Sequence, residues 1–442
     1  MHAALPQFQT LAQWLGDALA PGEDFSLGYA AEQSDFVRFN QARVRQAGQV
    51  QQTSLDLRLI RDGRHAEQQL SLSGEPQVDR QRLAEALQRL RAVLPLLPAD
   101  PYLRFNREPW RSHSLQLTAL PDCATVLEQV VREAAGLDLV GFYAAGPVSR
   151  GFASSSGAFG WHQASSFNLD WSLFHGNGQA VKAQYAGQHW QPDAFTARLQ
   201  QARDQLAYLG RPARSLAPGD YRAYLAPAAL QEVLELLGWG GFSAKALAEK
   251  DSPLQRLHGG EARLSPLLHL HEQVSGSLLP GFSSEGFPRR DLQLIRAGRP
   301  GEPLVSARSA AEYGLPGNGA SPWEAPSALV MAGGELAQAQ VLERLGTGLY
   351  IGNLWYLNYS DRPAARITGM TRFASFWVED GRIQAPLASM RFDDSLYRLL
   401  GSQLEALTRE RELSLASSTY RQRHNGSSLL PGALLGGLTL TL

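Results

Sequence analysis

The chain has 442 residues, a length that predicts two or three domains. Hydrophobic residues make up 44% of it and charged residues 19%, as in an ordinary globular protein. The formal net charge of −1 gives no overall positive charge that would attract nucleic acid. No apolar run approaches the roughly 20 residues of a membrane helix, and the single cysteine, Cys123, excludes an intramolecular disulfide. We therefore expect a cytoplasmic protein that binds neither nucleic acid nor a membrane.

The first half of the chain predicts helices packed on an antiparallel sheet. Leucines at helical spacing and the capping residue Asp122 predict helices at residues 8–19, 79–94, 122–135 and 193–209. Alternating apolar residues predict strands at residues 25–29, 37–39 and 55–59, and a buried strand is expected at residues 139–144. Residues 150–187, rich in serine, glycine and aromatic residues, predict a meander of antiparallel strands. Proline and glycine in residues 211–220 indicate a boundary between two domains, residues 1–215 and 216–442.

The second half predicts another sheet with fewer helices. A strand at residues 221–225 precedes a helix that begins at Pro227 and ends at Gly238. Further strands are expected at residues 265–274, 291–296 and 438–442, and a helix at residues 395–408. The two halves together predict an α+β protein with two domains, each with a largely antiparallel β-sheet flanked by helices.

Aromatic and β-branched residues are concentrated in residues 346–383. They predict three strands, separated by a loop at residues 361–363 and a turn at residues 379–381. We interpret Trp355 as a core residue, whose replacement by alanine should cost about 3–5 kcal/mol. The arginines between these aromatic residues fit a solvated loop better than a surface for single-stranded nucleic acid, because the chain has no net positive charge.

Sequence blocks in the second half resemble a known family. GLYIGNLWYLNYSD at residues 348–361 and EDGRI at residues 379–383 resemble the C-terminal domain of the TldD/PmbA family, and SEGFP at residues 284–288 is similar to another of its blocks. The resemblance implies a pair of related subunits, TldD and TldE, that form a zinc-dependent protease. It also implies a cavity enclosed by the two subunits, in which an unfolded peptide binds as an added strand.

The zinc motif of TldD-like members is missing from this sequence. In those members, the helix after the domain boundary carries His-Glu-x-x-x-His, which holds zinc and activates a water molecule. The corresponding helix here has Gln231, Glu232 and Leu236 at those positions, and the second half has no cysteine that would supply the family's further ligand. We expect no cofactor in this chain, zinc in a TldD-like partner, and a solvated helix glutamate at Glu232.

Residues typical of other chemistries occur outside that helix. His269 and His271 are two residues apart on a predicted strand, so both could meet one metal ion, although no other ligand is evident. The serines at residues 154–156 lack the Gly-x-Ser-x-Gly nucleophile pattern and predict a turn or a strand. Cys123 lies in a predicted amphipathic helix and is expected to be a small core residue.

The resemblance predicts a TldE/PmbA-like, non-catalytic subunit of a TldD/PmbA-type metalloprotease system, which binds unfolded peptides or modified-peptide precursors for proteolysis. Its partner is a TldD-like zinc-bearing paralogue or a second copy of itself, so we expect a dimer. Tyr350, Asn353 and Asn358 are the residues expected to contact the peptide, and turn formation is the other role open to the asparagines. The alternatives are a non-catalytic peptide-binding homodimer and a self-contained metallopeptidase or hydrolase, for which His269 and His271 are the metal candidates.

Overall fold

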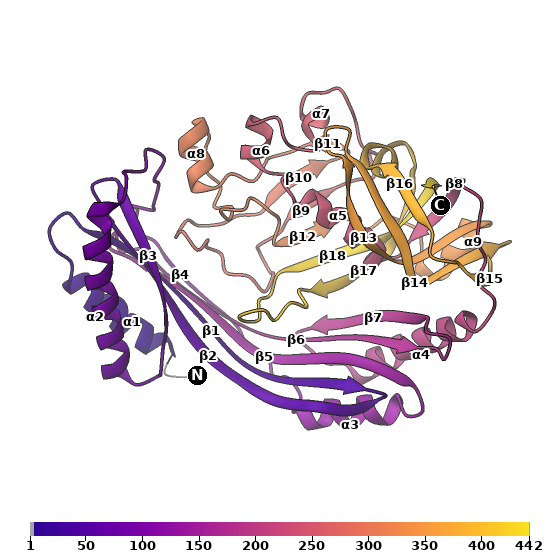
Figure 1. Ribbon diagram of the computed structural model, residues 1–442, viewed down its shortest axis with the longest axis horizontal. Helices are drawn as coiled ribbons and strands as arrows, with labels where there is room; N and C mark the ends of the chain where they lie inside the picture. The colour runs from indigo at the N-terminus through magenta and orange to yellow at the C-terminus, as the bar shows by residue number, and fades with distance from the viewer. Residues whose placement is uncertain (1–3, 442) are drawn as a thin grey trace.

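Two β-sheets with helices packed against them make up the computed structural model, which describes residues 4–441 (Figure 1). The α+β prediction is therefore confirmed, and each half of the chain builds one sheet. None of the helices in residues 4–441 combines the length and the apolar character needed to cross a membrane. The α-helices are α1 (Ala4–Asp17), α2 (Pro76–Val93), α3 (Cys123–Glu133), α4 (Pro192–Leu209), α5 (Pro227–Leu237), α6 (Ala244–Ala248), α7 (Gln255–His258), α8 (Ala307–Tyr313) and α9 (Val341–Leu345).

The first sheet has the strand order β3-β2-β1-β5-β6-β4, and β7 pairs with the second half of β6. Its pairings are antiparallel except that of β4 with β6. The strands are β1 (Asp24–Asn40), β2 (Arg43–Arg61), β3 (Arg64–Ser71), β4 (Arg111–Gln116), β5 (Asp138–Ser154), β6 (Phe159–Phe174) and β7 (Ala180–Gly187). Phe25, Leu27 and Tyr29 of β1 alternate into a core that α1 and α2 cover, as their spacing predicted.

The second sheet is organised by the C-terminal strand. Its strands are β8 (Gly219–Leu225), β9 (Leu270–Glu272), β10 (Leu292–Arg296), β11 (Arg299–Pro300), β12 (Ala328–Met331), β13 (Gly348–Asp361), β14 (Arg366–Glu379), β15 (Arg382–Pro386), β16 (Arg391–Ser395), β17 (Leu404–Leu415) and β18 (Ser427–Leu440). β18 lies parallel to β12 and antiparallel to β8, β16 and β17. Because β8 connects through β13, β14 and β16 back to β18, these strands close a ring around an apolar core.

Close packing in β18 depends on a glycine. Pro431 of β18 lies opposite Arg411 of β17, where the pairing of the two strands is irregular. The backbone N–H of the next residue, Gly432, donates a hydrogen bond to Thr408 Oγ1 at 2.7 Å. A side chain at Gly432 would place its Cβ 2.0 Å from the hydroxyl oxygen of Tyr224 in β8. Glycine therefore allows β18 to approach β8 at this point.

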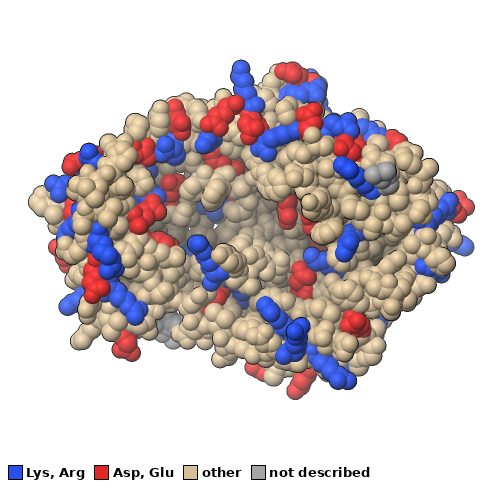
Figure 2. All heavy atoms as spheres, in the orientation of Figure 1, with Lys and Arg blue, Asp and Glu red and all other residues tan. Residues whose placement is uncertain are grey.

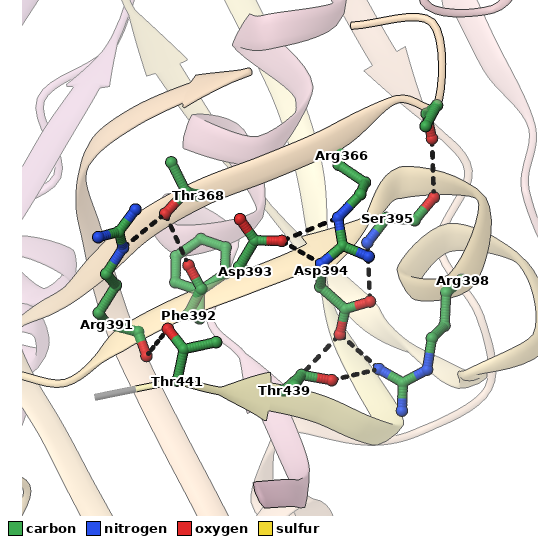
Figure 3. A network of polar contacts seen from close by, with 11 residues as sticks. Arg366, Thr368, Arg391, Phe392, Asp393, Asp394, Ser395, Arg398, Thr439 and Thr441 are labelled. Carbon is green, nitrogen blue, oxygen red and sulfur yellow. Dashed lines mark hydrogen bonds and ion pairs between the residues drawn. The ribbon is translucent and has the colours of Figure 1, made fainter. Parts of the chain in front are cut away.

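Paired charges fix the end of β18. Figure 3 shows the polar network that joins β14, β16 and β18. The buried carboxylate of Asp394 accepts hydrogen bonds from the backbone N–H of Thr439, at 3.1 Å, and from the guanidinium of Arg398. The same guanidinium forms an ion pair with Asp220 of β8. One arginine thus links three neighbouring strands at the edge where the chain ends.

The two halves share a hydrophobic core. Tyr143, Trp171 and Phe195 of the first half belong to the same buried cluster as Tyr350 and Phe376 of the second. The predicted boundary between residues 215 and 216 lies in the segment that connects α4 to β8. Because the core continues from one half into the other, the division into domains 1–215 and 216–442 stays a prediction.

Three predicted elements differ from the structure. Residues 395–408, expected as a helix, contain a short π-helical turn, Arg398–Ser402, and the first residues of β17. Gly401 has non-helical backbone angles, φ −113° and ψ −105°, and the residues after it pair with β18 instead. The strand expected at residues 265–274 is limited to β9. The last strand is longer than predicted, since β18 begins at Ser427.

Replacing Gly432 with alanine should lower the free energy of unfolding by roughly 1–3 kcal/mol, because β18 must move away from Tyr224. Gly176→Ala is the matched control, because a side chain there would meet no atom within 4 Å. Urea unfolding of the two variants measures the difference. Equal stability of the two would contradict the close approach of β18 and β8.

Candidate functional site

A cavity lies between the two halves of the chain. Its volume is about 310 Å³. Residues of α5, β13 and β17 line it from the second half, and residues of β7 and α4 line it from the first. Figure 1 shows these elements facing one another where the two sheets meet, and Figure 2 shows that this face of the molecule is hollowed between the halves. Cavities of this size are typical of ligand sites.

α5 is the helix that the sequence resemblance aligns with the zinc-motif helix of TldD-like members. It begins at Pro227, as predicted. Leu236 is buried in the apolar core, whereas Gln231 and Glu232 line the cavity. The Gln231 amide donates a hydrogen bond to Glu235 Oε1 at 2.7 Å. The two positions aligned with the zinc-binding histidines thus point to different environments, one to the core and one to the cavity.

Carboxylates and cations gather around the cavity. They are Asp170, Glu232, Glu235 and Glu412 with Lys182 and Arg198. Burial raises the pKa of Glu232, the nearby Glu235 raises it further and Lys182 opposes the rise. Desolvation by the surrounding protein atoms also raises the pKa of Glu412, although its side chain is exposed in the cavity lining, and Arg198 opposes the rise. Glu232 is half-buried, so the expectation of a solvated helix glutamate is wrong.

Two of the three residues expected to contact a peptide line this cavity. Tyr350 and Asn353 of β13 are only 8% and 7% exposed. The Tyr350 hydroxyl accepts a long hydrogen bond from Gln205 Nε2 at 3.5 Å, and burial raises the pKa of Tyr350 to about 12. The Asn353 amide has no hydrogen-bond partner among the described residues. Its donors and its acceptor are therefore available to a ligand.

The far end of β13 lies outside the cavity. Asn358 is exposed, and its side-chain oxygen accepts the backbone N–H of Tyr359 at 2.8 Å. Trp355 is 49% exposed and Tyr356 is 78% exposed, so the prediction of Trp355 as a core residue is wrong. The reason is a bulge: Tyr356 has a φ of 58°, and the register with β14 shifts between Trp355 and Asn358. The bulge changes which side chains of β13 face the core.

Two strand edges border the cavity. In the described chain, β7 pairs only with β6, and residues 411–415 of β17 pair only with β18. The Gln184 side chain of β7 bridges the two sheets by donating a hydrogen bond to the carbonyl oxygen of Leu415 at 2.9 Å. Strand edges of this kind expose main-chain donors and acceptors, to which an extended peptide adds.

The histidine pair lies away from this cavity. His269 borders a separate groove, and its Nδ1 accepts the backbone N–H of Ala297 at 3.4 Å. His271 lies on β9, where burial and then the nearby His269 lower its pKa. Within residues 4–441, no three or more His, Cys, Asp or Glu side chains are arranged to hold a metal ion. The pair therefore has no third ligand in this part of the chain.

The serine cluster and the cysteine have structural positions. Ser154 ends β5 and Ser156 lies in the turn that follows, with their hydroxyl oxygens 2.8 Å apart, and Ser156 also donates to the carbonyl oxygen of Asn106. Cys123 is half-buried at the start of α3, and burial raises the pKa of its thiol to about 11. A thiol with so high a pKa stays protonated near neutral pH and is a poor nucleophile.

Comparisons with known proteins agree with this fold. Residues 218–441, about half of the chain, match the family model described as the PmbA/TldA metallopeptidase C-terminal domain. TldE from Thermococcus kodakarensis is similar over 99% of this chain and 100% of its own, with a TM-score of 0.79 and 14% identity. A protein from Thermotoga maritima, described as a candidate modulator of a DNA gyrase, covers the same shares, with a TM-score of 0.76 and 13% identity.

A protein from Bacteroides thetaiotaomicron with the same description is similar over 98% of both chains, with a TM-score of 0.74 and 17% identity. No curated protein sequence matches this chain. At these identities the structural similarity establishes a common fold and leaves the activity to be argued from the site.

Trp355→Ala should change the free energy of unfolding by about 1 kcal/mol or less, because half of the side chain is already in water. Phe376→Ala is the contrasting variant, since Phe376 is 0% exposed and its loss should cost about 3–5 kcal/mol. Urea unfolding of both variants gives the comparison. If Trp355→Ala loses as much unfolding free energy as Phe376→Ala, Trp355 is a core residue after all.

Proposed function

This chain belongs to the TldD/PmbA family, and from that premise we propose that it is a TldE/PmbA-like subunit of a TldD/PmbA-type metalloprotease system. In this role it binds an unfolded peptide, or a modified-peptide precursor, in the cavity described above. A zinc-bearing TldD-like paralogue cleaves the bound peptide in the cytoplasm. The observation that carries the proposal is the polar cavity on α5, the helix that corresponds to the family's zinc-motif helix.

Amide side chains support peptide binding in the cavity. They are Gln184, Gln201, Gln205, Gln231, Gln338 and Asn353. Each amide carries donors and an acceptor of the kind that a peptide backbone needs. Gln184, Gln205, Gln231 and Gln338 already use some of these groups within the protein. The edges of β7 and β17 add main-chain groups beside them. Recognition through the backbone suits substrates of varied sequence, because it does not depend on particular side chains.

The residues of α5 favour a subunit without catalytic zinc. Zinc takes nitrogen, sulfur or carboxylate ligands, so the Gln231 amide is a poor ligand and Leu236 is none. The Gln231 amide is also engaged by Glu235, and Leu236 is 2% exposed. Glu232 keeps the position of the family's glutamate, but without the metal it has no activated water to deprotonate.

Exposed aromatic residues on β13 support pairing with a second subunit. The rings of Trp355 and Tyr356 lie 5.7 Å apart, and the guanidinium of Arg372 lies 4.6 Å from the centre of the Trp355 ring. Tyr356 and Phe373 both have a positive φ, which costs roughly 1–3 kcal/mol for such residues and is typical of functional surfaces. Tryptophan, tyrosine and arginine are the residues that dominate interface energetics. We place a TldD-like paralogue, or a second copy of this chain, against this surface.

The purified chain should contain no stoichiometric zinc, because α5 supplies no histidine and a catalytic zinc site needs three protein ligands. Elemental analysis by mass spectrometry measures the metal content. About one zinc per chain that is lost in His269→Ala would contradict the proposal. That result would favour the self-contained hydrolase instead.

Asn353→Ala should weaken binding of an unstructured peptide by about tenfold and leave the melting temperature nearly unchanged, because the amide faces the cavity and has no partner to lose. Asn358→Ala is the matched control, since it makes the same change on the same strand outside the cavity. Fluorescence anisotropy measures the affinity. If Asn353→Ala binds the peptide with unchanged affinity, the peptide does not bind in this cavity.

Mixed with a zinc-bearing paralogue, the chain should form a dimer and support cleavage of an unstructured peptide, while the chain alone should cleave nothing. A stable pair should bury at least on the order of 1,000 Å². Ultracentrifugation reports the pairing, and a discontinuous assay reports the cleavage. A monomer both alone and with the paralogue contradicts the pairing. Chelator-sensitive cleavage by this chain alone contradicts the non-catalytic role.

A further inference from the structure

The cavity contains more carboxylates than cations. The carboxylates Asp170, Glu232, Glu235 and Glu412 face only Lys182 and Arg198. Both cations are already engaged by the protein. Lys182 Nζ lies 3.9 Å from Asp170 Oδ2, and the Arg198 guanidinium lies 4.7 Å from the centre of the Tyr185 ring. The cations therefore leave part of the negative charge without a close partner.

Glu232 and Glu412 carry this unbalanced charge. Neither carboxylate has a hydrogen bond or an ion pair within the part of the chain that the structure describes. They come from different elements, α5 and β17, and both line this cavity. Glu232 is half-buried and Glu412 is exposed in the cavity lining. A partly buried charge such as that of Glu232 is unfavourable unless it is paired. A positively charged ligand would supply the missing partner.

A second and independent observation points to a ligand in the same cavity. Asn353 is 7% exposed, it lines the cavity, and its amide has no hydrogen-bond partner among the described residues. Buried polar groups are nearly always hydrogen-bonded in folded proteins. A ligand that binds in the cavity would therefore supply hydrogen-bond partners for this unpaired amide. The donors and the acceptor of the amide match those of a peptide backbone.

We propose that the cavity selects peptides with a lysine or arginine side chain, whose positive charge is neutralised by Glu232 and Glu412 while Asn353 holds the adjacent backbone. This inference rests on the proposed peptide-binding function and adds a substrate class to it. The strand edges and amides bind the peptide backbone and therefore tolerate many peptide sequences. The carboxylates add a preference for peptides that carry a basic side chain. Hydrogen bonds to charged groups are stronger than those between neutral groups, so one basic residue is sufficient for a measurable preference.

The test compares two peptides that differ by one charge. Both are unstructured, acetylated at the N-terminus and amidated at the C-terminus, so that a single arginine carries the only charge. In the second peptide this arginine is replaced by citrulline, which has nearly the same shape and is neutral. Affinities for the full-length chain are measured by fluorescence anisotropy. Because only the peptide changes, the comparison does not depend on the folding of a variant.

The arginine peptide should bind the wild-type chain at least about tenfold more tightly than the citrulline peptide. Glu232→Gln and Glu412→Gln should each reduce this preference, because each removes one of the unbalanced charges. Glu128→Gln is the matched control and should keep the full preference, since Glu128 is an exposed glutamate on α3 that does not line the cavity.

The outcomes separate this inference from the function on which it rests. Measurable and equal binding of the two peptides would overturn the preference for a cation and leave peptide binding in place. If neither peptide binds, both the preference for a cation and the proposed peptide binding are overturned. A preference that survives in the Glu232→Gln, Glu412→Gln double variant would show that the cation is recognised elsewhere, and so would also overturn the assignment to this cavity.

Discussion

The position of β18 determines where the walls of the cavity lie. β18 pairs with β17, which carries Glu412, and with β8, which leads directly into α5 and Glu232. β13, with Asn353, lies parallel to β8. The second-half walls thus depend on one strand and on the glycine, Gly432, that lets it approach β8. A local change in β18 would move several lining residues at once, because strands in a closed ring cannot shift independently.

The proposed function and the proposed preference for a cation both draw on the residues of α5 that the resemblance aligns with the zinc motif. In a zinc-bearing relative, the metal ion supplies positive charge beside the motif's glutamate. Here Gln231 and Leu236 occupy the histidine positions, while Glu232 keeps its place and faces the cavity. In the proposed subunit a carboxylate without a metal beside it needs another cation, which a basic side chain of the substrate would supply. Binding and catalysis would then be divided between two related subunits.

Secondary structure could be predicted from the sequence for elements with strong local patterns. The prediction failed for elements whose structure is determined by tertiary contacts. α5, with Pro227 at its start, and the strands of residues 346–383 follow from local patterns. The helix expected at residues 395–408 failed because Gly401 interrupts it and β18 offers a strand partner. Trp355 was misplaced because aromatic density does not reveal a bulge.

The candidate site shows the same division. Asn353 was predicted as a polar residue within an apolar strand, whereas Glu232 was expected to be a solvated helix glutamate and its place in the cavity lining was missed. Lys182, Arg198 and Glu412 could not be predicted, because they come from β7, α4 and β17 and only the fold brings them together.

The central claim is that an unfolded peptide binds in the cavity at the edges of β7 and β17. Hydrogen–deuterium exchange of the chain, with and without an unstructured peptide, tests this claim most directly. Bound peptide should slow exchange in residues 180–187 and 411–415, since an added strand pairs with those edges, and should leave α1 and α2 unchanged. Unchanged exchange at both edges under saturating peptide would contradict the account.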